Sequence, residues 1–226
     1  MRQTASHSYQ NIGNAHKAGL ELSRGARCLE SYARYLIENV PAEPPAPEEN
    51  LIQLLKEALQ YRSSAAGFFR SVTGSVLNLA FELSFNSKTM SFLRTHCPEY
   101  KTPETLDQMI KDLSESSIIF EDHREYKEAY FGYRHLAMSL MDKGRSDLSC
   151  YLPAISSVHK AIEMSEKGRL DPARAPKLYG IAASAYRRLA RACNDRYTDF
   201  YREQAREMAL IALEAADKAD EEITRS

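Results

Sequence analysis

Apolar side chains recur along this chain with the three- and four-residue spacing of a single helical face. Three clear faces are Leu106, Met109, Ile110 and Leu113; Ile155, Val158, Ala161 and Ile162; and Met208, Ile211, Ala212 and Ala215. No stretch alternates apolar and polar residues with a period of two for long enough to predict a strand. The pattern therefore predicts an all-α protein.

The prolines indicate where helices begin and end. The nine prolines lie in a few short stretches, at Pro41, Pro44, Pro45, Pro47, Pro98, Pro103, Pro153, Pro172 and Pro176. Proline lacks the backbone N–H and clashes with the preceding turn, so helix interiors exclude it while the first turn tolerates it. We therefore expect about eight helices. They cover residues 5–23, 26–40, 48–70, 74–95, 103–142, 148–167, 174–194 and 197–222, with an alternative in which the fifth breaks near 120–122.

Small residues in the C-terminal half predict closely stacked helices. Alanines recur through 182–192 and 205–219. Tyr179 and Tyr186 stand seven residues apart on the first of these two predicted helices. Large residues that fill gaps between small ones are typical of antiparallel helix pairs of the tetratricopeptide (TPR) type.

From these features we predict one all-helical domain over residues 1–226. It comprises an N-terminal helical arm (1–40), a proline-rich linker (41–47) and a stack of antiparallel helices (48–226).

Composition narrows the classes of function. Lys and Arg number 30 and Asp and Glu 31, a net charge of −1, which argues against a nucleic-acid-binding protein or a strongly basic membrane surface. No run approaches the roughly 18 apolar residues of a transmembrane segment. The four cysteines lie far apart without a CxxC pair, and the first residues lack the apolar core of a signal peptide. We therefore expect reduced thiols and a cytoplasmic location.

Recognisable catalytic patterns are missing. The six histidines form no HExxH or other metal-binding spacing, and the glycines form no phosphate-binding loop. There is no nucleophile elbow around a serine. The sequence therefore predicts a non-enzymatic protein without metal or cofactor, and a helical enzyme without a known motif is the least favoured alternative.

Three segments resemble the 14-3-3 family. EENLIQLLKEALQYRSSAAGFFRSV (48–72) is similar to the third helix of that family, and KEAYFGYRHLAMSLM (127–141) to its fifth. AIEMSEKGRLDPARAPKLYGIAASAY (161–186) is similar to the run that joins two later helices. The resemblance implies antiparallel helices related to tetratricopeptide stacks, that is, a 14-3-3-like or TPR-like superhelix.

The resemblance also implies a phosphate-binding groove. Carried over to this chain, Lys56, Lys127 and Arg134 would face that groove. Three positions depart from the family: Ser63 stands where the family has a second groove arginine, His135 where it has a tyrosine, and Ser184 where it has an asparagine.

The favoured interpretation is a helical adaptor that binds an acidic or phosphorylated peptide segment of a protein partner. Residues expected to contribute to binding are Lys56, Arg62, Lys127, Arg134, His135 and Ser184. Arg188, on another helix, is expected to lie outside the groove. The alternative is a dimeric helical bundle that scaffolds membrane or cytoskeleton.

A homodimer through residues 1–40 is also expected. The resemblance places the dimer at this end of the chain. The N-terminal residues Ile12, Ala15, Ala18, Gly19 and Leu22 lie on one helical face, and the small ones would let a second helix approach.

Overall fold

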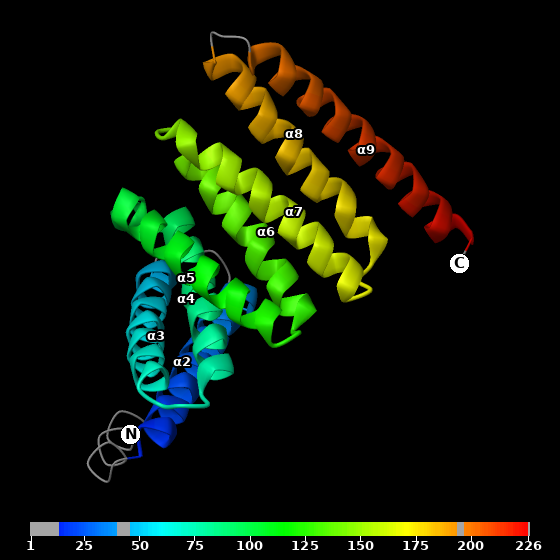
Figure 1. Cartoon of the computed structure of the whole chain (residues 1–226). Coiled ribbons are helices and arrows are strands. Elements are labelled where there is room, and N and C mark those ends of the chain that lie inside the picture. Colours follow the sequence, from blue (N-terminus) through cyan, green and yellow to red (C-terminus); the bar gives the residue numbers. More distant parts are fainter. Residues whose placement is uncertain (1–13, 40–45, 194–196, 226) are drawn as a thin grey trace. The chain divides into compact units, whose positions relative to one another are not determined.

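The computed structural model describes residues 14–39, 46–193 and 197–225, and this part of the chain contains α-helices, short 3₁₀ turns and no strand. The α-helices are α2 (Ala15–Asn39), α3 (Ala46–Arg70), α4 (Val76–His96), α5 (Pro103–Asp122), α6 (Tyr126–Lys143), α7 (Tyr151–Lys167), α8 (Ala175–Ala192) and α9 (Tyr197–Arg225) (Figure 1). The predicted all-α class and the stacked, TPR-like helix pairs are thereby confirmed.

Two helix boundaries differ in an informative way. The predicted 103–142 helix breaks where its alternative placed the break, because Arg124 adopts a left-handed φ of 60° between α5 and α6. The backbone N–H of Glu125 then donates to the carbonyl of Phe120 at 2.9 Å, which closes the end of α5. By contrast, the predicted interruption between 23 and 26 is wrong, since α2 runs through the buried Gly25 without a break.

The chain divides into two compact units, the first ending at Ile119 and the second beginning at Phe120. The prediction of a single domain over 1–226 stays a prediction. In the first unit α2 packs along α3, and α3 along α4. In the second, α6 packs with α7, α7 with α8 and α8 with α9, while α6 also approaches α8 directly.

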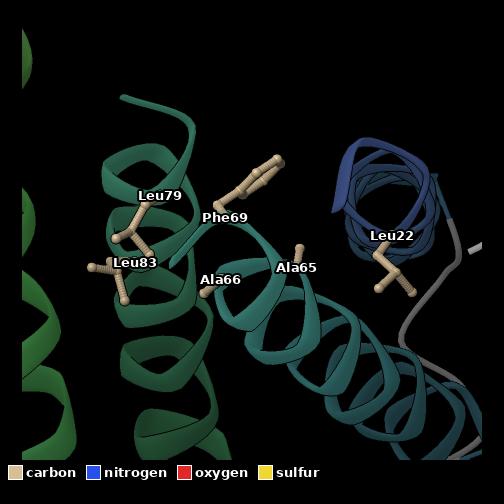
Figure 2. Packing of buried hydrophobic residues seen from close by; sticks show 6 residues of the cluster. All are labelled: Leu22, Ala65, Ala66, Phe69, Leu79 and Leu83. Atoms are coloured by element: carbon tan, nitrogen blue, oxygen red, sulfur yellow. The ribbon is translucent and has the colours of Figure 1, made fainter. Parts of the chain in front are cut away.

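The apolar core of the first unit joins three helices around α3. Ala65, Ala66 and Phe69 of α3 lie between Leu22 of α2 and two leucines of α4, Leu79 and Leu83 (Figure 2). All six are buried. Leu22 of α2 is therefore part of this core, while the predicted division into an arm, a linker and a stack stays a prediction.

The same packing removes the basis of the expected dimer contact. Ala18, Gly19 and Leu22 are buried by their own chain, and a Cβ added to Gly19 would stand 2.8 Å from the ring of Phe69. The small residues of α2 thus admit α3 of the same molecule and leave no room for a second helix on that face. Ile12 lies outside the described residues.

A buried arginine connects α2, α3 and α4. Arg62 of α3 is 0% exposed, and its Nε and Nη2 donate to the two carboxylate oxygens of Glu30 on α2 at 2.6 and 2.5 Å. Its Nη1 donates to Glu82 on α4 at 2.8 Å. Ser23 donates to the second oxygen of Glu82, and Thr89 donates to Glu30. Every donor nitrogen of this guanidinium therefore has a carboxylate partner.

We expect Arg62→Met to lower the free energy of unfolding by about 3–5 kcal/mol, because it leaves the buried carboxylate of Glu82 and the partly exposed carboxylate of Glu30 without their cation. Urea unfolding followed by circular dichroism measures the change. The matched control is Arg70→Met: Arg70 pairs with Glu115 at 2.7 Å, but its side chain is 46% exposed. Such a pair contributes about 0–1 kcal/mol. Equal losses for the two variants would contradict the structural role of Arg62.

A second buried polar group lies between α4 and α5. The oxygens of Asp112, which is 1% exposed, accept from Asn86 at 2.8 Å and from Gln108 at 2.6 Å. Burial raises the pKa of Asp112, and these two hydrogen bonds oppose the rise without cancelling it. Nearby, the buried Oδ1 of Asn86 has no hydrogen-bond partner in the described residues.

The pKa of Asp112 is higher in the folded protein than in the unfolded chain, where it is about 4. Ionisation of Asp112 therefore lowers the free energy of unfolding as the pH rises above about 4. We therefore expect Asp112→Asn to stabilise the protein more at about pH 7 than at about pH 4, relative to wild type. Once the Asn86 amide turns over, the new amide group can donate to Oδ1 of Asn86 while its oxygen still accepts from Gln108. Chemical unfolding at the two pH values tests this, and an equal difference at both would contradict it.

Candidate functional site: a cationic pocket between α6 and α8

Two helix faces of the second unit enclose a pocket of ≈ 450 Å³. From α6 and the turn after it come Arg134, Met138, Met141, Asp142 and Arg145; from α8 come Lys177, Gly180, Ile181, Ser184 and Arg188. On each helix these positions follow the three- and four-residue spacing of one face. Because α6 and α8 both pack against α7, these faces lie next to each other.

The pocket carries an excess of positive charge. Arg134, Arg145, Lys177 and Arg188 line it together with a single carboxylate, that of Asp142. Asp142 is near Arg145, whose Nε lies 3.6 Å from Oδ1 of the carboxylate. Among the described residues that line the pocket, no second carboxylate is present to pair with the other three cations.

Arg188 is held in place by an aromatic side chain of α7. Its Nη1 donates to the hydroxyl of Tyr151 at 3.3 Å, and its guanidinium lies 5.9 Å from the centroid of the same ring. Tyr151 is 2% exposed and belongs to the core cluster that joins α7 to α8. The Arg188 side chain is therefore anchored on one side, while its half-buried guanidinium lines the pocket on the other.

Arg134 is the unusual member of the site. Its Nε is buried and has no hydrogen-bond partner within the described residues. Leaving a buried donor unpaired costs on the order of 1–3 kcal/mol. A guanidinium that lines a pocket and keeps an unpaired donor is suited to an acceptor that arrives from outside, such as a carboxylate or a phosphate.

The structure brings together two of the six residues proposed from sequence, Arg134 of α6 and Ser184 of α8. Lys127 and His135 also belong to α6 but do not line the pocket. Lys127 is exposed and His135 is half-buried.

The remaining two residues lie in the first unit. Lys56 pairs with Glu99, and this hydrogen bond raises the pKa of Lys56. The full burial of Arg62 and its pairing with Glu30 and Glu82 do not fit a role in peptide binding.

Sequence analysis missed Lys177, Arg188 and the two methionines of α6. Arg188 was expected outside the groove, yet it lines the same pocket as Arg134. One signal was available: the α8 segment contains four cations and no Asp or Glu, which is unusual in a chain whose acids and bases nearly balance. The spacing of Lys177, Ser184 and Arg188 then places all three on one helical face.

Within the described residues no three His, Cys, Asp or Glu side chains gather in a way that could hold a metal ion. Among the described helices none combines the length and apolar character needed to cross a membrane.

Comparisons with known proteins point to helical repeats. Two structures of a Podosopora anserina protein described as a kinesin light chain with nearly identical TPR-like repeats match with TM-scores of 0.49, at 14% and 13% identity. They cover 100% of this chain and 95% and 96% of theirs. A circular tandem repeat protein with a novel repeat topology matches with a TM-score of 0.44 and 15% identity, over 99% of this chain and 52% of its own.

No protein-family model and no curated protein matches the chain. The structural likeness is to TPR-like helical repeats and gives no specific support to the 14-3-3 resemblance. With TM-scores below 0.5, these matches carry no argument about function.

We expect Arg134→Met to leave the free energy of unfolding unchanged or to raise it by about 1 kcal/mol, because it removes a buried donor that has no partner. Methionine retains much of the aliphatic volume of the arginine. Urea unfolding measures the effect. A loss of more than about 2 kcal/mol would mean that Arg134 forms a stabilising interaction in the folded protein, and would contradict its assignment as an open binding group.

Proposed function

We propose that this protein is a non-enzymatic helical scaffold that binds an acidic or phosphorylated segment of a partner protein in the pocket between α6 and α8. The observation that carries the proposal is the buried, unpartnered Nε of Arg134 in a pocket that Lys177 and Arg188 also line. The stacked helix pairs supply a rigid frame for these side chains. The four cysteines form no disulfide in the described part of the chain, which accords with the reducing, cytoplasmic location proposed from sequence.

The chemistry of the pocket supports an anionic ligand. Each charge-assisted hydrogen bond from a guanidinium to a carboxylate or phosphate contributes about 1.5–3 kcal/mol. Arg188 is already oriented by Tyr151, so less side-chain entropy is lost when it binds. Met138, Met141 and Ile181 add an apolar wall for the aliphatic parts of the bound segment.

The alternative of a membrane-scaffolding bundle finds less support. A membrane-binding helix needs an uninterrupted basic face. On α7, by contrast, Lys160 pairs with Glu121 at 2.7 Å and Lys167 with Glu163 at 2.6 Å. Such paired cations would have to leave their carboxylates before they could bind lipid headgroups.

An immobilised peptide array with acidic, phosphorylated and neutral sequences tests the proposal. Wild-type protein is expected to bind a subset of the acidic or phosphorylated peptides and none of the neutral ones. For those peptides we expect Arg134→Gln and Arg188→Gln each to weaken binding by about tenfold or more, the equivalent of one charge-assisted contact. Fluorescence polarisation of the selected peptides gives the affinities.

The matched control is Arg206→Gln, which removes an equally charged, exposed residue of α9 that lies outside the pocket. It should bind like wild type. Helical circular dichroism should stay unchanged in all three variants. Undiminished binding by both pocket variants, or equal loss in the Arg206 variant, would refute the site.

A further inference from the structure

A second basic pocket adjoins the first along α8. It measures ≈ 520 Å³ and is lined by Arg187, Ala190 and Arg191 of α8, by Cys193, and by Thr198 and Arg202 of α9. Three guanidinium groups thus line it, and the lining residues that belong to the described part of the chain include no carboxylate. Arg202 does contact Asp199 at 3.1 Å, but that carboxylate is 91% exposed, so solvent screens the pair.

The walls of this second pocket are fixed by the junction of the two helices. The hydroxyl of Thr198 donates to the backbone carbonyl of Cys193 at 2.6 Å, which ties the first turn of α9 to the end of α8. Tyr186 of α8 lies 6.3 Å from Tyr201 of α9, ring centroid to ring centroid. The arginines of the two helices are therefore held on opposite walls of the pocket.

The two pockets follow each other along one helix. Arg188 lines the first and Arg191 the second, and residues three apart are neighbours on a helix surface. The first pocket spans positions 177–188 of α8, and the second spans positions 187–191 of α8 and Cys193 just beyond its end. Their centres are about eight residues apart along the chain, which corresponds to an axial separation of about 12 Å at the helical rise of about 1.5 Å per residue.

From this arrangement we propose that the two pockets are subsites for one extended partner segment whose two anionic side chains stand three or four residues apart. An extended chain advances about 3.3 Å per residue, so three to four residues span the distance of about 12 Å. The inference rests on the proposed function, since it assumes that the pocket between α6 and α8 binds an anionic segment. It adds the charge pattern by which a partner is recognised.

The test uses short Gly/Ser peptides that carry one phosphoserine, or two at spacings of i+1, i+4 or i+8, and the same series with glutamate. Fluorescence polarisation at fixed ionic strength measures each affinity. The i+4 peptide is expected to bind at least about tenfold more tightly than the single-anion peptide, because the second contact becomes intramolecular. The i+1 peptide has the same total charge but cannot reach both pockets, so it should gain less.

Variants of the second pocket distinguish binding at the first pocket from the use of both pockets by one segment. Arg191→Gln, and independently Arg202→Gln on the opposite wall, should abolish the advantage of the i+4 spacing while leaving single-anion affinity unchanged. Arg206→Gln, outside both pockets, should retain the advantage. Two variants on different helices guard against a local folding defect in either one, and circular dichroism verifies their helix content.

Each outcome has a definite meaning. If no anionic peptide binds at all, the proposed function itself fails. If single-anion peptides bind but affinity does not depend on spacing, or follows total charge only, the two-subsite inference is overturned while the first pocket stands. If a single-stranded oligonucleotide of matched charge binds as tightly as the i+4 peptide and loses affinity in the same variants, the assignment of a protein segment as partner is overturned.

Discussion

The buried guanidinium of Arg62 organises the first unit because it must be neutralised where it lies. It donates to carboxylates that the structure supplies from two helices, Glu30 of α2 and Glu82 of α4, and it also lies over the ring of Phe85. A buried charge without such partners would cost several kcal/mol. The pairing of Arg62 with both carboxylates therefore fixes the positions of α2 and α4 along α3 more precisely than alanine and leucine packing could, since apolar contacts tolerate small displacements.

Arg134 differs from Arg62 because the buried part of its guanidinium has no carboxylate partner in the described residues. It also keeps part of its guanidinium from water, but no carboxylate approaches the Nε in the described residues. The surrounding cations at Lys177 and Arg188 increase the cost of concentrating positive charge. The second unit therefore bears an electrostatic penalty that a bound anion would relieve. This contrast is the physical reason for giving Arg62 a structural role and for proposing a binding role for Arg134.

Helix pairing explains why cationic side chains collect between α6 and α8. Each of these helices packs against α7, so each presents a neighbouring face that cannot be fully covered by the helix between them. Alanines such as Ala182 and Ala185 allow α8 to approach its neighbours closely, while the long side chains of Arg188 and Lys177 extend from its other positions. The basic character of α8 then extends toward α9, where Arg191 and Arg202 line the second pocket.

The sequence by itself determined the helical class and most helix boundaries, because apolar periodicity and proline are local signals. It offered the break between α5 and α6 only as an alternative, and that break lies at the left-handed backbone of Arg124. It also pointed to Arg134 and Ser184. Tertiary structure alone decided that Arg62 is a core residue and that Arg188 lines the pocket, since both facts depend on which helices become neighbours. The type of a charged side chain is known from the sequence, whereas its burial and its partners depend on contacts between residues distant along the chain.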